Sequence, residues 1–193
     1  INSNGDIAIT GQFSSNSLTF GNLTLSKPFT FSNSCLTAKL DSSGTLLWLK
    51  YAGDDATPQS IGIDSAGIVY SIGNFGTSFT IGTFNFTNSG TGQDIYIVHY
   101  DINGNETWAN SYGSNLDDYP AEILVSQSGE ISFAGNFKGN SINLGTTTLT
   151  NAGTNTYDVF LASSSSTATG LTNSSTNYTS KILAFPNPVN EIL

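Results

Sequence analysis

The chain has 193 residues, only 10% of them charged, and its 14 acids outweigh five lysines to give a net charge of −9. That length allows one domain with a sizeable core or a few repeat units. Because it has no arginine and few cations, the chain is expected to bind neither nucleic acid nor anionic lipid.

The single cysteine and the start of the chain carry two further expectations. Cys35 excludes an intrachain disulfide, and its apolar strand position predicts a small buried side chain rather than a reactive thiol. No apolar run approaches the roughly 18 residues of a membrane span. The first residue is Ile1 and no signal peptide precedes it, so we expect a processed product or a fragment.

Internal repetition is the strongest pattern in the sequence. The segments GDIAITGQF, GIVYSIGNF and GEISFAGNF begin at Gly5, Gly67 and Gly129, at two equal intervals of 62 residues. Each segment alternates apolar and polar residues, which is typical of half-buried β-strands. We therefore expect three copies of one unit.

The other elements of the unit follow in the same order along the chain. An inserted segment (LTFGNLTL, FTIGTFNFT, INLGTTTLT) is predicted to add one extra strand, and a strand opening on a polar residue follows it. In two copies a turn and a strand bearing Trp48 or Trp108 come next. The turn at Asn103-Gly104 predicts a type I′ hairpin, because that dipeptide tolerates positive φ twice. One unit is thus expected to hold four main antiparallel strands.

Four antiparallel strands per repeat, with Trp and Gly landmarks, are typical of a β-propeller blade. Over residues 5–162 the pattern resembles the secreted bacterial propeller repeats related to the SBBP repeat. This resemblance implies an all-β fold with about three partial four-stranded blades in residues 1–162. A closed ring needs about 4–8 blades. We therefore expect a piece of a longer protein, or an open or assembled β structure.

The end of the chain differs in composition from the repeats. Residues 163–180 are nearly all Ser, Thr, Asn and Gly, which predicts a flexible linker. In residues 181–193, KILAFPNPVNEIL, two prolines favour an extended chain, as in the first strand of a second small β domain.

This tail resembles the beginning of the type A C-terminal sorting domain of type IX secretion substrates, a small β-sandwich. The matching residues are Phe185, Pro186, Asn187, Pro188, Val189, Asn190 and Leu193. The resemblance implies that the tail binds the type IX translocon and its outer-membrane shuttle protein. It also implies cargo that is secreted, or displayed on the cell surface of a Gram-negative bacterium.

Two pairs of acids and one serine are candidate sites. Asp54, Asp55, Asp117 and Asp118 follow the Trp strands at positions that a spacing of 63 relates to each other. Paired loop carboxylates could bind Ca²⁺, the one cofactor that the sequence suggests, but aspartates that cap turns are the favoured interpretation. A catalytic acid/base pair is disfavoured, because equivalent loops give similar environments. Ser65 in DSAG fits a loose O-glycosylation pattern, but an ordinary turn between two strands is the favoured interpretation.

The single histidine and the strand aromatics are further candidate residues. His99 is the only histidine and aligns with Lys39, which predicts an outward, solvated position without a catalytic role. One His and one Cys exclude a zinc site of four such ligands within this chain. The strand aromatics could stack on carbohydrate, but their recurrence favours packing between units. They are Trp48, Tyr70, Tyr96, Trp108, Phe133 and Phe160.

The sequence therefore predicts an adhesin-like or ligand-binding scaffold without catalytic residues, with a glycan or surface partner as ligand. One alternative is a propeller glycosidase or lyase whose catalytic residues lie in blades outside this chain. Another treats the chain chiefly as cargo held by the secretion machinery. No nucleic-acid partner and no membrane span are expected.

Overall fold

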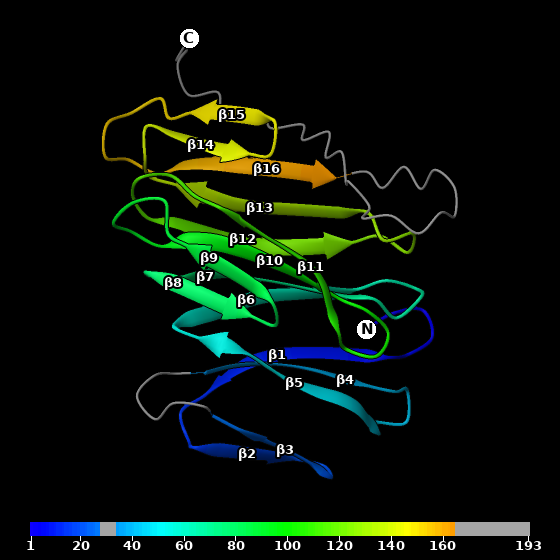
Figure 1. Ribbon diagram of the computed structural model, residues 1–193. Coiled ribbons are helices and arrows are strands. Elements are labelled where there is room, and N and C mark those ends of the chain that lie inside the picture. The colour runs from blue at the N-terminus through cyan, green and yellow to red at the C-terminus, as the bar shows by residue number, and fades with distance from the viewer. Residues whose placement is uncertain (28–33, 165–193) are drawn as a thin grey trace.

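The structure is a computed structural model, and it describes residues 1–27 and 34–164. All regular elements in these ranges are β-strands, paired antiparallel throughout, which confirms the prediction of an all-β fold. The larger strands form three sheets, and the smaller ones form three separate hairpins. Figure 1 shows the three sheets stacked one on another along the molecule.

The sheets contain the elements that the repeat predicts, in the predicted order. Sheet I consists of β1 (Ile7–Phe13), β4 (Ser34–Leu40) and β5 (Leu46–Asp54). Sheet II consists of β6 (Ala56–Ile63), β7 (Val69–Phe75), β10 (Asp94–Tyr100) and β11 (Glu106–Tyr112). Sheet III consists of β12 (Asp118–Val125), β13 (Ile131–Phe137) and β16 (Asp158–Ser164).

The inserted segment of each unit is a two-stranded hairpin, so the prediction of one extra strand there was wrong. The hairpins are β2 (Ser17–Phe20) with β3 (Leu23–Ser26), β8 (Ser78–Ile81) with β9 (Phe84–Thr87), and β14 (Ser141–Leu144) with β15 (Thr147–Thr150). Gly21, Gly82 and Gly145 adopt φ of 60°, 55° and 68° between the two strands. This left-handed conformation, which glycine accepts without steric cost, reverses the chain within two residues.

The hairpin between β10 and β11 is confirmed, but its turn is not type I′. Gly104 has φ of 81°, whereas Asn103 is not among the residues with positive φ. The Asp101 N–H donates to the Asn105 carbonyl over 2.9 Å, which closes a three-residue loop. The register shifts at His99 and Tyr100, as expected for a type I turn followed by a left-handed residue and a bulge. Sheet I has the same loop, in which the Asp41 N–H donates to Thr45.

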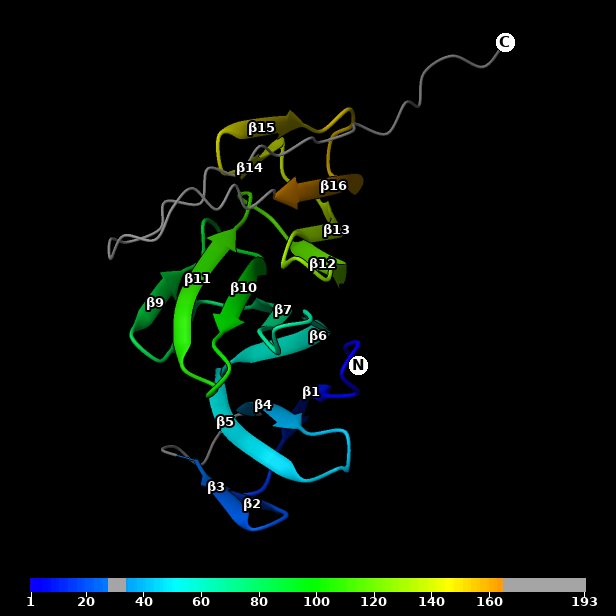
Figure 2. The ribbon, with the colours of Figure 1, turned by 90° about the vertical axis from the view of Figure 1, so that its right-hand side faces the viewer.

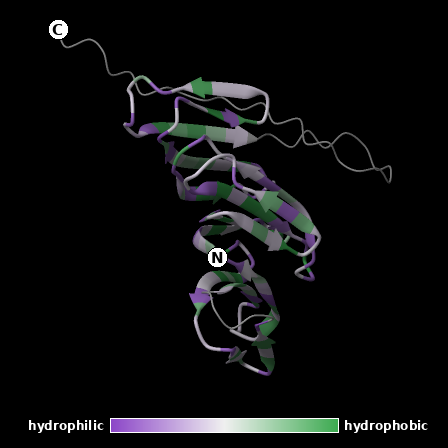
Figure 3. Cartoon of the chain, turned by 60° about the vertical axis from the view of Figure 1, so that its left-hand side comes forward, coloured by the Kyte–Doolittle hydropathy of each residue, from purple (hydrophilic) through white to green (hydrophobic). Residues whose placement is uncertain are grey.

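The hydrophobic core lies between the sheets, because each strand turns alternate residues to opposite faces. Figure 3 shows hydrophobic and hydrophilic residues alternating along the strands. The core between sheets I and II, here the first interface core, is built around Cys35, Trp48, Val69, Phe75, Phe79, Ile81, Tyr96, Val98 and Tyr100. The core between sheets II and III, the second interface core, is built around Tyr70, Ile72, Ile95, Ile97, Tyr112, Ile123, Phe133, Phe137, Ile142, Leu144 and Phe160.

A third, smaller cluster lies on the outer face of sheet I and includes Phe13, Leu36, Ala38 and Leu49. Sheets I and III thus occupy opposite ends of the stack, with sheet II covered on both faces (Figure 2). Strand β16 ends at Ser164, two residues beyond the end expected for the repeat region. The described part of the chain holds no helix that is long and apolar enough to cross a membrane.

Candidate functional sites at the two edges of the sheets

Because neighbouring strands are antiparallel, their ends alternate between two opposite edges of the stack. One edge, here called the acidic edge, contains the end of β5 and the beginnings of β6, β10 and β12, with Asp54, Asp55, Asp94, Asp117 and Asp118. The other, here called the turn edge, contains the tight turns 41–45, 64–68 and 101–105. The predicted site residues in the described ranges lie at one or the other.

The four predicted aspartates of the acidic edge have partners within the protein. Asp54 accepts a hydrogen bond from the Ser34 hydroxyl, and Asp117 accepts one from the Gln93 N–H over 3.2 Å. Asp118 accepts both the N–H and the hydroxyl of Ser114, the latter over 2.9 Å. Asp55 has φ of 59°, and its carbonyl accepts the Gly76 N–H. Asp117 and Asp118 thus cap backbone N–H groups, as the sequence favoured, whereas Asp54 bonds to a side chain of the paired strand and Asp55 contributes a backbone carbonyl.

The predicted equivalence of the two acid pairs was wrong by one residue. Asp118 pairs with Phe137, and the residue that pairs with Phe75 at the same place in sheet II is Ala56. Asp117 therefore corresponds to Asp55, and Asp118 has no acidic counterpart. The reason is loop length: the connection from Gly113 into β12 is two residues longer than the connection from Gly53 into β6.

Asp94 is a site residue that sequence reasoning missed. It is only 1% exposed, and its Oδ2 accepts the N–H and hydroxyl of Ser89 over 2.8 and 2.7 Å. Its Oδ1 is buried without a hydrogen-bond partner. The carboxyl group lies against Gly113, where a Cβ would come within 2.3 Å of both oxygens. The sequence does show that a polar residue begins this strand in every unit. It does not show that Asp94 is buried, because that burial depends on the neighbouring loop.

Asp94 and Asp118 together form a buried carboxyl pair. Burial raises the pKa of Asp118 to about 6, the hydrogen bonds from Ser114 oppose this shift, and the charge of Asp94 adds to it. Burial also raises the pKa of Asp94, against the hydrogen bonds from Ser89. Both groups therefore favour the neutral acid more than an exposed aspartate does.

The acidic edge offers few ligands for a metal. Across residues 1–27 and 34–164 no three His, Cys, Asp or Glu side chains gather as a metal-binding group. Ca²⁺ takes six to eight oxygen ligands. The Ca²⁺ interpretation of Asp54, Asp55, Asp117 and Asp118 stays a prediction from the sequence.

The Asp118→Asn variant is expected to be more stable than the native chain at pH 7.5 and to depend less on pH between 4 and 6. The folded chain holds the Asp118 proton up to about pH 6, whereas an unfolded aspartate loses it near pH 4. The folded state thus binds more protons in this window, so native stability falls as pH rises through it. Urea unfolding at several pH values measures the effect.

Asp41→Asn is the control of opposite sign. A hydrogen bond from the Ser43 hydroxyl, with further bonds from Thr45 and the Ser43 N–H, lowers the pKa of Asp41. The Asp41 carboxylate therefore stabilises the folded chain at neutral pH, and this stabilisation is lost as the pH falls. The Asp41→Asn variant should lose it and be less stable at pH 7.5. If the stability of Asp118→Asn declined above pH 4 as much as that of the native chain, the pH dependence could not be assigned to Asp118.

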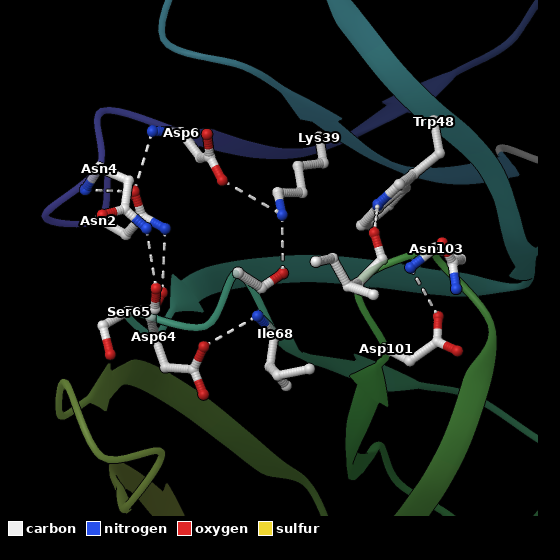
Figure 4. A network of polar contacts seen from close by, with 12 residues as sticks. Asn2, Asn4, Asp6, Lys39, Trp48, Asp64, Ser65, Ile68, Asp101 and Asn103 are labelled. Atoms are coloured by element: carbon white, nitrogen blue, oxygen red, sulfur yellow. Dashed lines mark hydrogen bonds and ion pairs between the residues drawn. The ribbon is translucent and has the colours of Figure 1, made fainter.

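The turn edge holds Lys39, for which the predicted outward, solvated position was wrong. Lys39 is 1% exposed, and its Nζ lies 3.3 Å from Asp6 Oδ2 and 3.0 Å from the Gly67 carbonyl oxygen. Figure 4 shows the side chain extending from sheet I to the turn of sheet II. The neighbouring turn covers the ammonium group and supplies an oxygen, so burial leaves it paired and hydrogen-bonded.

His99 occupies the same strand position in sheet II and is half-buried rather than solvated. Its ring meets Tyr70 edge-on, with centroids 4.8 Å apart, and its Nδ1 contacts the Thr107 hydroxyl. Burial lowers the pKa of His99, with nearby acids opposing the shift. The imidazole therefore packs within sheet II as a neutral ring at physiological pH.

A ladder of hydrogen bonds links successive turns along this edge. Asn2 donates to the Asp64 carbonyl over 3.0 Å, and Asn4 donates to the Ser65 carbonyl over 2.9 Å (Figure 4). Ser65 in turn donates from its hydroxyl to the Gln127 carbonyl over 2.6 Å. The half-buried Ser65 hydroxyl thus joins sheets II and III, and its glycosylation stays a prediction.

The aromatic residues and Cys35 behave as packing residues. Trp48 stacks on Tyr100 with centroids 5.6 Å apart and donates from Nε1 to the Ile102 carbonyl over 3.1 Å. Tyr70, Tyr96, Phe133 and Phe160 are buried, and Trp108 is half-buried against the second interface core. Cys35 is fully buried, and burial together with the charge of Asp54 raises its pKa to about 12. Packing between units is confirmed for the buried aromatics, as is the buried cysteine.

The predicted sorting residues, 185–190 and 193, lie outside the residues that the structure describes. A scan of the chain against protein-family models gives no match, and neither does a search of curated proteins.

Proposed function

We propose that the three sheets are blades of a β-propeller and that the chain is a non-catalytic, adhesin-like scaffold. Its cellular role would be cargo of the type IX secretion system, released from or displayed on a Gram-negative cell. Its ligand would be a glycan or a partner on another surface.

The equivalence of the sheets carries the proposal. The same repeat positions fill both interface cores: Phe79 and Ile81 of one hairpin in the first, Ile142 and Leu144 of the next in the second. Sheet II is a complete four-stranded antiparallel meander covered on both faces. Meanders stacked face to face in this way are the architecture of propeller blades, which typically present ligand-binding loops at their edges.

The use of the reactive side chains supports a role without catalysis. Cys35 is buried and donates to the Ala56 carbonyl over 3.0 Å. Lys39 links two sheets, His99 packs on Tyr70, and Asp118 holds the loop at Ser114. A catalytic group must be reachable by a substrate, whereas these groups hold strands and turns together.

The export part of the proposal depends on the sequence of the tail, FPNPVN, and on the acidic, weakly charged composition that suits an extracellular scaffold. The order of elements in the chain, from repeats through a Ser/Thr-rich stretch to this tail, is the order found in the resembling cargo proteins.

The test is to express the chain behind a periplasmic signal peptide in a bacterium that has a type IX system. The native chain should reach the surface or the medium and confer adhesion to a glycan-coated surface. Pro186→Ala with Pro188→Ala should leave it in the periplasm, because the extended PNP segment is lost. Asn173→Ala, in the Ser/Thr-rich stretch, is the matched control.

Equal export of the double-proline variant and the native chain would contradict the sorting role. Normal export without adhesion to any glycan or cell surface would contradict the adhesin-like role and leave the sorting role standing.

A further inference from the structure

We propose that a second copy of this chain docks on the outer face of sheet III through the outer face of its own sheet I, so that copies associate head to tail. The packing between the sheets supports this docking, which goes beyond the proposed function.

The outer face of sheet III, here called the C-face, has three exposed apolar side chains. Leu124 is 65% exposed, Val159 is 55% exposed and Leu161 is 44% exposed. These three are among the most exposed large hydrophobic residues of the described chain, and they lie on the two outer strands of sheet III, β12 and β16, on either side of β13. Single exposed apolar residues need no explanation, but a group of them on one face marks a contact surface.

The register of the strands shows what the same positions do inside the stack. Val159 pairs with Asn136 as Ile95 pairs with Asn74, and Leu161 follows it as Ile97 follows Ile95. Ile95 and Ile97 are both 0% exposed, because sheet III covers them. Leu124 corresponds to Gly62, where a Cβ would come within 2.3 Å of Val125 of sheet III. At Val159 and Leu161 the C-face thus repeats positions that another unit covers elsewhere, whereas Leu124 stands where sheet II has a glycine packed closely on sheet III.

The outer face of sheet I, here called the N-face, is the matching half. In sheet III the hairpin residues Ile142, Leu144 and Leu149 pack into the second interface core against sheet II. Their counterparts on hairpin β2–β3 are Leu18, Phe20 and Leu25, which are only half-buried beside Phe13 and Leu36. A second copy that places these residues on Val159 and Leu161 would reproduce the contact between sheets II and III.

This geometry fixes the kind of assembly. The two faces differ, so the contact is heterologous, and copies either add in an open series or close into a ring. If the sheets are propeller blades, as the proposed function states, two copies supply six, within the usual range of about 4–8. Each copy carries a charge of −9, so salt should strengthen the association by screening repulsion.

The test is the mass of the purified full chain by sedimentation velocity and light scattering in 0.5 M NaCl, up to roughly 100 μM, where an interface of micromolar Kd would be filled. The native chain should rise from the 20.3 kDa monomer to a dimer or larger species. Val159→Asp with Leu161→Asp blocks the C-face at exposed positions that belong to neither interface core. Leu18→Asp blocks the N-face, and Ile102→Asp, at an exposed apolar residue of the turn edge, is the control.

Each blocked variant should remain monomeric at all concentrations, and a mixture of the two should form a 1:1 complex through the one intact pair of faces. The control should associate like the native chain. A native chain that stays monomeric, a C-face variant that still associates, or a mixture that stays monomeric would overturn the proposal. These measurements involve neither export nor a glycan, so their failure is separate from failure of the proposed function.

Discussion

The Ile142→Ala variant is expected to lose about 2–5 kcal/mol of unfolding free energy. Ile142 lies on hairpin β14–β15, is fully buried, and belongs to the core between sheets II and III. Truncation removes apolar contacts and leaves a cavity between two sheets whose backbones are held by their own ladders, so little collapse can relieve it. Denaturant unfolding followed by fluorescence of the two tryptophans measures the loss.

Leu18→Ala is the matched control for Ile142→Ala. Leu18 holds the same position on hairpin β2–β3 of sheet I, but no further sheet covers it in the described chain. In dilute solution its truncation should cost about 1 kcal/mol or less, because a half-buried side chain loses less apolar contact. Equal losses at the two positions would show that the stacking of sheets does not determine burial.

The Gly73→Ala variant is expected to lose about 1–3 kcal/mol or more, a large effect for one methyl group. Gly73 is the repeat glycine in the middle of β7, between Pro58 of β6 and Tyr96 of β10. A Cβ there would lie 2.3 Å from the Thr57 carbonyl oxygen and 2.6 Å from the Tyr96 hydroxyl oxygen. The first of these is a backbone atom beside a bulge, so relief requires β6 to move.

Gly135→Ala should behave like Gly73→Ala, and Gly11→Ala should not. At Gly135 a Cβ would lie 2.4 Å from the Tyr119 carbonyl oxygen and 2.7 Å from Phe160 Cζ. At Gly11, the equivalent in β1, nothing lies within 4 Å, because β1 pairs only with β4 in the described chain. Alanine there should be neutral, or stabilise by about 0.4–1 kcal/mol through the unfolded chain. Three equal losses would contradict this account of the glycines.

Much of the fold could be predicted from the sequence because the alternation of apolar and polar residues within a strand indicates which residues face inward. The alternation in 67–75 and 129–137 predicts strands that the structure has as β7 and β13. Repeats also give internal controls, so a strand identified in one copy identifies its counterparts. The inserted hairpins were predicted as single strands, because two strands of four residues show too little alternation to be told apart from one longer strand.

The candidate sites were less predictable, because they depend on which atoms the neighbouring sheet or loop places beside each side chain. Lys39 and His99 share a position in the repeat, yet one is an ion-paired link to the next sheet and the other packs on Tyr70. Asp94 opens its strand as Ser34 opens β4, and only the longer loop before β12 gives it Asp118 as a neighbour. Alternation within one strand tells which face a residue is on, but not which atoms cover that face.

The three sheets stack in chain order through defined side-chain contacts, and NOE spectroscopy on the full chain can detect those contacts. Cross-peaks are expected between the rings of Trp48 and Tyr100, whose centroids lie 5.6 Å apart across sheets I and II. Cross-peaks are also expected between the rings of Tyr112 and Phe133, whose centroids lie 5.6 Å apart across sheets II and III. If both sets of cross-peaks are absent while the strands within each sheet remain paired, the stacked arrangement is wrong.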